Sequence, residues 1–324
     1  MPPHRETNSR LGFKLPGFIA FKCIGAGAYG TVFHTIRSAT NQSVAIKRIK
    51  FAETDQGVPA YALREAAVLK RLVHKNIVKL YEVQIVNRQM FLIFELHPRD
   101  LEHLMNSAKK TGYFSASIIK RFMRDILSGI NFIHSRKLIH RDLKPTNILV
   151  AADFQLKLCD FGFCRAEDLE CAFTPEVGTC YYYSPEVCLG RSDYGWGVDI
   201  WAVGCIFAEL FKLAPFFEGE TKLANLLSIF RQLGSPTEEN WPQFSKMDIP
   251  LEFPCTPGIP LSTTFPRMDA QALDLLQKLL AYSPARRCSA LVALRHPYLA
   301  QLDAEGSKEG NPAKIASSMK CTLL

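Results

Sequence analysis

The chain has 324 residues, of which 48% are hydrophobic and 22% are charged, and its formal net charge at pH 7 is +8. This length allows one large domain or two smaller ones, and the composition is that of an ordinary globular protein. No run approaches the roughly 18 apolar residues of a membrane-spanning helix. The basic residues are spread along the chain, which argues against a nucleic-acid partner.

The ten cysteines are scattered, and none forms a Cys-x-x-Cys pair. We therefore expect reduced thiols rather than zinc ligands or disulfides. The first ten residues are polar and lack the apolar core of a signal peptide. We predict a cytoplasmic or nuclear protein with a flexible leader over residues 1–17 and a polar tail over residues 301–324.

A glycine-rich stretch, Gly-x-Gly-x-x-Gly, occupies residues 25–30 between strand-like runs at 18–24 and 31–36. A dinucleotide-binding fold places a helix after such a motif, but the β-branched residues Thr31 and Val32 favour a strand. The pattern therefore indicates either a flap over phosphate groups or a simple hairpin turn.

A third strand is predicted over Ser43–Ile49, and its Val-Ala-Ile-Lys sequence ends at Lys47. Such a lysine can reach the α- and β-phosphates of a nucleotide, although a solvated strand lysine is the alternative. Pro59–Leu72 has the apolar spacing of a helix. Within that helix, Glu65 is the expected ion-pair partner of Lys47.

Two more strands are predicted over residues 77–86 and 90–94, and the polar stretch 95–100 follows them. This polar break separates a small β-rich lobe (18–95) from a larger helical lobe (101–300), so we place a hinge at residues 95–100. Free backbone groups at such a hinge can hydrogen-bond to the edge of an adenine ring.

The stretch His140–Asn147, which we call the polar loop, reads His-Arg-Asp-Leu-Lys-Pro-Thr-Asn and lies between apolar segments. A predicted amphipathic helix over residues 115–136 leads into it. The loop offers a carboxylate (Asp142), an ammonium group (Lys144) and an amide (Asn147), and its proline stiffens the backbone between them.

Two further motifs follow the polar loop. A predicted strand over residues 155–159 ends at the Asp-Phe-Gly sequence that begins at Asp160. The sequence Tyr-Ser-Pro-Glu at 183–186 lies downstream, before a very apolar helix that begins at Gly197.

The order of these motifs over residues 18–300 resembles that of protein kinases. The helix sequence Pro-Ala-Tyr-Ala-Leu-Arg-Glu at 59–65 resembles the Pro-Ser-Thr-Ala-Ile-Arg-Glu helix of cyclin-dependent kinases, the element that a cyclin grips. The chain is most similar to the branch of cell-cycle-related and kinase-activating kinases. The resemblance implies an α+β, bilobal fold, ATP-dependent phosphorylation of Ser and Thr hydroxyls on protein substrates, and a cyclin-like partner at the Pro59–Leu72 helix.

The resemblance also implies a role for each polar side chain. Asp142 would accept the proton of the substrate hydroxyl, and Lys144 would stabilise the transferring phosphoryl group. Asn147 and Asp160 would bind Mg²⁺, and Lys47 would hold the phosphates of ATP. The remaining ATP-binding residues are expected to come from the flap, the strands and the hinge: Ile24, Gly25, Ala26, Gly27, Ala28, Tyr29, Gly30, Val32, Ala45, Glu95, His97 and Leu149.

Arg64, Arg141 and Arg165 match three arginines that in this family gather around a phosphorylated threonine, which here would be Thr174. A phosphate group of about −1.5 to −2 charges could order the surrounding segment through these guanidinium groups. An upstream kinase would then be a partner. The alternative is three independent surface salt bridges.

The sequence departs from the family at two sites, because Ala28 in the flap replaces an inhibitory threonine found in many relatives and the substrate-reading site differs as well. At that second site, Tyr183 replaces an arginine that helps to shape a pocket for proline after the target residue, and Gly178 replaces a residue that is usually strained there. Specificity for proline is therefore left open. In the flap, Tyr29 is either a regulatory phosphorylation site or an aromatic cap.

The family pattern predicts three further contacts. Glu186 and Arg287 would form a structural ion pair, and Thr179 would bridge to the aspartate and lysine of the polar loop. Packing is expected to stack four buried side chains in a column: Leu69, Leu80, His140 and Phe161.

Two cysteines leave alternatives open. Cys159 is either a site of covalent modification or a buried structural thiol. Cys321–Leu324 fits a prenylation motif, and a membrane would be a partner only if Cys321 were prenylated; otherwise the tail simply ends in leucines. A catalytically weak kinase-fold scaffold is the competing function, and the complete set of polar motif residues argues against it.

Overall fold

The computed structural model describes residues 13–27, 30–49, 58–110, 112–167, 180–242, 244, 253 and 255–300. Several sequence predictions fall on residues outside this described part and stay predictions. They concern most of the leader, the tail after residue 300, Ala28, Tyr29, Thr174, Gly178, Thr179 and Cys321.

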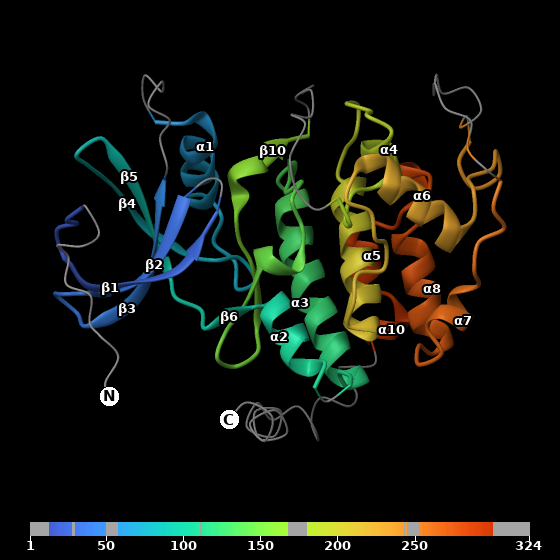
Figure 1. Ribbon diagram of the computed structural model, residues 1–324, viewed down its shortest axis with the longest axis horizontal. Helices are drawn as coiled ribbons and strands as arrows, with labels where there is room; N and C mark the ends of the chain where they lie inside the picture. The colour runs from blue at the N-terminus through green and yellow to red at the C-terminus, as the bar shows by residue number, and fades with distance from the viewer. Residues whose placement is uncertain are drawn as a thin grey trace.

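The small lobe is built on a five-stranded antiparallel sheet with the order β1-β2-β3-β5-β4 (Figure 1). Its strands are β1 (Phe18–Ala26), β2 (Gly30–Arg37), β3 (Gln42–Ile49), β4 (Leu80–Val86) and β5 (Gln89–Glu95). The predicted strand over residues 77–86 begins three residues late, at Leu80. Ile77 and Val78 instead pair with Leu158 of the large lobe.

Alternation along β3 gives the sheet two different faces. Val44 and Ile46 point to one face, where they join a buried cluster that contains Phe13 and Leu15. The prediction of a flexible leader up to residue 17 is therefore wrong for Phe13 and Leu15, because their apolar side chains cover the outer face of the sheet. Lys47 lies on the opposite face.

Helix α1 (Ala60–Leu69) packs beside the sheet (Figure 1). Its buried residues are Ala62, Glu65, Ala66 and Leu69, so a carboxylate is carried on the buried face. The predicted helix extended to Leu72, but the last residues form i to i+3 hydrogen bonds, including Leu72 N–H to the Leu69 carbonyl at 3.3 Å. Such bonds belong to tight turns rather than to an α-helix.

The large lobe is mostly helical (Figure 1). Helix α5 runs through its interior and is buried from Gly197 to Leu210. The helices are α2 (Leu101–Ala108), α3 (Ala116–His134), α4 (Pro185–Cys188), α5 (Gly197–Lys212), α6 (Lys222–Leu233), α7 (Leu261–Thr264), α8 (Ala270–Leu279), α9 (Ala290–Leu294) and α10 (Pro297–Ala300). Among the described residues, no helix combines the length and the apolar character needed to cross a membrane.

Short strands position the polar loop at the junction of the lobes. The strands are β6 (Arg99–Asp100), β7 (Leu138–Ile139), β8 (Ile148–Val150), β9 (Leu156–Leu158) and β10 (Arg165–Ala166). They form a sheet β6-β8-β9 and a pair β10-β7. The polar loop connects β7 to β8, and Asp160 follows β9. The α+β, bilobal architecture predicted from the sequence is confirmed.

Candidate active site

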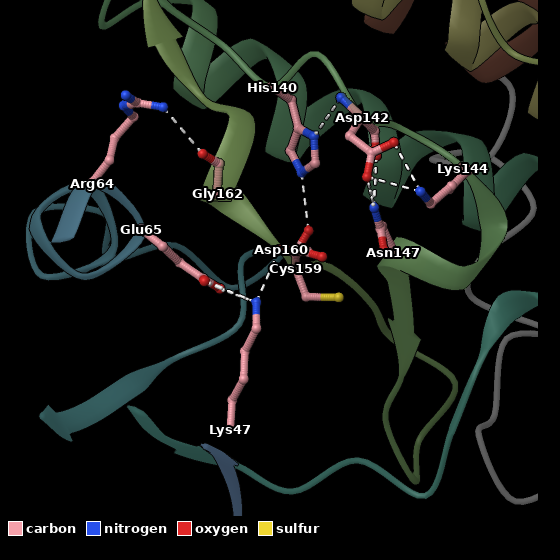
Figure 2. Close-up of polar contacts among 10 residues, drawn as sticks. All are labelled: Lys47, Arg64, Glu65, His140, Asp142, Lys144, Asn147, Cys159, Asp160 and Gly162. Carbon is pink, nitrogen blue, oxygen red and sulfur yellow. Dashed lines mark hydrogen bonds and ion pairs between the residues drawn. The ribbon is translucent and has the colours of Figure 1, made fainter. Parts of the chain in front are cut away.

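Lys47 lies at the centre of an ion cluster that joins the two lobes (Figure 2). Its Nζ is 2.8 Å from Glu65 Oε2 and 3.0 Å from Asp160 Oδ1. The three side chains come from β3, from α1 and from the segment after β9. The structure therefore brings together the lysine, its expected partner and the expected metal ligand.

The cluster fixes the charges of its members. Burial alone would lower the pKa of Lys47, but the carboxylates of Glu65 and Asp160 outweigh it and raise that pKa above its usual range. Burial would raise the pKa of Asp160, yet the Lys47 ammonium group brings it below the ordinary value. At neutral pH the site thus presents a fixed ammonium group beside an ionised carboxylate.

In the polar loop, the Asp142 carboxylate accepts hydrogen bonds from Lys144 and Asn147 (Figure 2). Lys144 Nζ donates to Oδ1 and Oδ2 of Asp142, each at 2.9 Å. Asn147 Nδ2 donates to Asp142 Oδ2 at 2.7 Å and to the Asp142 carbonyl at 2.8 Å. A short 3₁₀ turn, Pro145–Asn147, folds the amide back toward the carboxylate. Asp142 is therefore held in one orientation.

The backbone of the polar loop is anchored by Asp199, whose role the sequence analysis missed. The buried carboxylate of Asp199 accepts hydrogen bonds from the N–H groups of His140 and Arg141, both at 2.8 Å, and lies 2.8 Å from His134 Nε2. Arg141 has a φ of +73°, a conformation that is strained for a residue with a β-carbon. The available signal was a carboxylate within the otherwise apolar start of α5.

His140 connects the polar loop to the segment that carries Asp160. Asp142 N–H donates to His140 Nδ1 at 3.3 Å, so Nε2 carries the proton and donates to the Cys159 carbonyl at 3.0 Å. The imidazole packs on Phe161, with ring centroids 4.8 Å apart. These contacts form the middle of the predicted column, and its other two members, Leu69 and Leu80, pack in the same core.

The predicted ATP-binding residues that the structure describes lie on strands β1, β2, β3 and β8 and at the hinge. Val32 on β2 lies opposite Gly25 on one side and Lys47 on the other. A β-carbon added at Gly30 would collide with the Arg48 carbonyl, whereas one at Gly27 would meet nothing within 4 Å. Gly30 thus closes the hairpin, and the space around Gly27 permits a close approach by a ligand. The other described members lie on β1 (Ile24, Ala26), on β3 (Ala45) and on β8 (Leu149).

At the hinge, the Glu95 carboxylate is committed to contacts within the protein. It accepts a hydrogen bond from Lys79 N–H at 2.8 Å, lies 2.9 Å from Lys157 Nζ on β9, and has His97 Nε2 at 3.4 Å. Burial alone would raise the pKa of Glu95, but its contacts with His97, Lys157 and Lys79 lower it to about 2. Because the Glu95 side chain is occupied in this way, only the backbone groups of Glu95 are available to contact a nucleotide.

The three predicted phosphate-sensing arginines lie near one another. Arg64 Nη1 donates to the Gly162 carbonyl at 3.4 Å (Figure 2). Arg141 lies two residues after Ile139 of β7, the residue with which Arg165 pairs. Arg165 follows Cys164 in the chain and pairs with β7. The structure thus gathers these arginines just before residues 168–179, which include Thr174.

A second ion pair, between Glu186 and Arg287, lies deep in the large lobe as predicted. Arg287 Nη1 and Nη2 donate to the two carboxylate oxygens at 2.5 Å and 2.7 Å. The guanidinium group also donates to the carbonyls of Gly197, Ala281 and Tyr282. Every contact is internal, so this pair is structural.

Tyr183 and Cys159 bear on questions that the sequence left open. Tyr183 packs against a small apolar cluster of Ile139, Val187 and Val198, together with Tyr194. Burial raises the pKa of Cys159 far above its ordinary value, so its sulfur is a thiol rather than a reactive thiolate. This environment favours a buried structural thiol at Cys159 over a site of covalent modification.

Asp160 and Asn147 fit the role of magnesium ligands. Both offer side-chain oxygens, which Mg²⁺ prefers, and the Asp160 side chain is 27% exposed. Within the described part of the chain, no group of three or more His, Cys, Asp or Glu side chains is arranged to hold a metal ion. An ion bound here would depend on phosphate oxygens and water to complete its shell.

Comparison with known proteins agrees with this geometry. Residues 18–299 match the family described as protein kinase domain. The chain is also 38% identical over 298 residues to "Cell division control protein 2 homolog 3" of Trypanosoma brucei brucei, an alignment that covers 91% of this chain and 95% of the relative.

Proposed function

Because the chain belongs to the protein kinase family and is cyclin-dependent-kinase-like, we propose that it transfers the γ-phosphoryl group of ATP to Ser or Thr hydroxyls of protein substrates. The observation that carries this proposal is the assembled Lys47, Glu65 and Asp160 cluster beside the oriented Asp142. A scaffold would not need these charges in place.

In this proposal, each side chain performs one physical task. The Lys47 ammonium group, held by Glu65, binds the α- and β-phosphates. Asp142 orients the substrate hydroxyl and accepts its proton, and Lys144 balances negative charge on the transferring phosphoryl group. Catalysis arises mainly from positioning and electrostatic stabilisation, because the loose transition state needs little covalent help.

Asn147 and Asp160 would hold Mg²⁺. When bound, the ion neutralises charge on the phosphates. The protein's own contribution is to keep Asp160 ionised through Lys47 and to keep the Asn147 amide fixed through Asp142.

We infer Ser/Thr specificity from Lys144, two residues after Asp142, and from the similarity to cyclin-dependent kinases. The clustering of Arg64, Arg141 and Arg165 supports phosphorylation of Thr174 as the regulatory event. Two results together would reject this part of the proposal. Thr174→Ala would retain full activity, and mass spectrometry would find Thr174 unmodified in the active enzyme.

A cyclin-like partner at α1 is the remaining element of the proposal. The buried Glu65 couples the position of α1 to Lys47, so a protein that binds α1 could control the ion cluster. A pull-down from native extract, followed by identification of bound proteins, tests this element. The proposed partner would be rejected if no protein bound in a way that depends on α1 and if the isolated chain were fully active.

The direct test of the proposed function is transfer of radiolabelled phosphate from ATP by wild type and by Asp142→Asn. The substitution keeps a side chain of the same size but removes the carboxylate base. We expect a loss of about 10²–10⁴-fold in rate. Equal background signals from the two proteins would favour a scaffold.

A further inference from the structure

A small cavity of about 20 Å³ lies next to Asp142. Its walls come from the polar loop (residues 141–144), from Tyr182–Ser184, from Tyr194 and from α5. A volume of this size accommodates a single water molecule, provided that the water finds two to four polar partners. The walls combine apolar side chains, such as Leu143, Val187 and Val198, with several polar groups.

Ser184 provides the first polar group. Ser184 is 1% exposed, and within the described part of the chain its Oγ makes no hydrogen bond. Ser184 is the N-cap residue of α4, where a serine hydroxyl ordinarily accepts a backbone N–H, but here it makes no capping bond. A buried hydroxyl without a partner is destabilising, so the position calls for a hydrogen-bonding group in the cavity.

Arg141 and Tyr194 provide further polar groups on the same walls. The guanidinium carbon of Arg141 lies 5.6 Å from the centre of the Tyr194 ring, so the two side chains are neighbours. A guanidinium N–H can donate to a water molecule, and a tyrosine hydroxyl can donate or accept. Together with Ser184, they give a water the number of partners that a buried site requires.

We propose that one buried water molecule occupies this cavity and bridges Ser184 Oγ to the Arg141 and Tyr194 side chains. The bridge ties the segment before α4 to the polar loop that carries Asp142. Ser184 is then a positioning residue: it touches no reacting atom and acts through the water on Arg141.

The primary test is a high-resolution crystal structure of the full chain. We expect an ordered water within hydrogen-bonding distance of Ser184 Oγ and of at least one polar atom of Arg141 or Tyr194. An empty cavity, a Ser184 hydroxyl bonded elsewhere, or a substrate side chain occupying the same space in a peptide complex would each overturn the proposal.

A second test asks whether Ser184→Ala lowers or raises the melting temperature. If the hydroxyl is satisfied by water, Ser184→Ala should lower the melting temperature by about 2–4 °C, the shift typical of one lost hydrogen bond in a domain of this size. If the hydroxyl has no partner, its removal should leave the melting temperature unchanged or raise it, which would reject the bridge. Ser228→Ala is the matched control, because the buried Ser228 Oγ accepts a known hydrogen bond from Glu218 N–H at 3.1 Å.

The positioning role has its own kinetic test, which rests on the proposed kinase function. We expect Ser184→Ala to lower kcat for a peptide substrate by about two- to tenfold, as for one lost hydrogen bond, while KM for ATP stays unchanged. An unchanged kcat would reject the positioning role. The crystal structure and the melting temperature do not depend on activity, so failure of the water site and failure of the proposed function remain distinguishable.

Discussion

Two buried sets of charged side chains among the described residues use charge in different ways. The side chains of Arg287 and Glu186 are 0% and 3% exposed, and all their contacts are internal. In the cluster around Lys47, the lysine and Asp160 side chains are 13% and 27% exposed. One pair is sealed inside a lobe, whereas the other opens at the junction of two lobes.

This difference shows which charges remain able to act on a ligand. The Arg287 guanidinium group is saturated by a carboxylate and three carbonyl oxygens, so nothing further can bind it. Among the described residues, Lys47 Nζ pairs only with the carboxylates of Glu65 and Asp160, and Asp160 stays partly open to solvent. We conclude that Arg287 contributes to stability and that Lys47 contributes to activity, and the variants below test that division.

The largest stability effect is expected at the sealed pair. Arg287→Ala leaves the Glu186 carboxylate buried without its partner, and we expect a loss of about 3–5 kcal/mol in the free energy of unfolding. Urea denaturation measures this loss. The neighbouring exposed Arg286 is the control, because Arg286→Ala should change the unfolding free energy far less. Similar values for the two variants would contradict a structural role that is specific to Arg287.

An intermediate loss of stability is expected at Phe13, whose ring contacts the guanidinium group of Arg48. The Arg48 guanidinium carbon lies 4.9 Å from the centre of the Phe13 ring, and Phe13 also packs on Phe21 and Phe33. We expect Phe13→Ala to lower the unfolding free energy by about 2–3 kcal/mol through lost burial and a lost cation–π contact. Lys14→Ala, at the exposed neighbouring position, should have little effect in the same denaturation experiment. A small loss for Phe13→Ala would mean that the segment covers the sheet without stabilising it.

The smallest effect is expected at the partly exposed pair of Glu95 and Lys157. Glu95→Gln should cost about 1–2 kcal/mol at pH 7, because the glutamine side-chain oxygen can still accept the hydrogen bond from Lys79 N–H and only the charge is lost. The folded state lowers the pKa of Glu95 from 4.5 to about 2, so the wild type has its full stabilisation above about pH 4.5. That stabilisation disappears as the pH falls toward 2. Denaturation at several pH values should therefore show the difference between wild type and Glu95→Gln shrinking on acidification. A difference that grows would contradict the ionised Glu95 contact.

Local motifs predicted the chemistry of the site because each motif carries its chemical groups within a few residues. The positions of the strands along the chain, the Lys47 and Glu65 pair and the Glu186 and Arg287 pair followed from such motifs and from the family resemblance. Roles that depend on distant packing were less visible. Asp199 supports the polar loop from 58 residues away, the separation of its contact with Arg141.

The leader shows the same limit for apolar residues. Leu11, Phe13 and Leu15 alternate as in a half-buried strand, but this local pattern does not say which surface Phe13 and Leu15 would pack against. Their burial depends on the outer face of the sheet, where Val44, Ile46 and Phe91 would otherwise be uncovered. Tertiary packing, rather than local propensity, determines where this segment lies.

The most direct test of the division between the two ion pairs is a joint measurement on Lys47→Met. We predict that phosphoryl transfer falls by about 10²–10³-fold, the effect of removing one preorganised charge. The unfolding free energy should fall by less than it does in Arg287→Ala, because Asp160 is partly exposed, whereas removing Arg287 leaves three backbone carbonyl oxygens unpaired in addition to the carboxylate. Retained transfer activity, or a stability loss as large as that of Arg287→Ala, would contradict the account.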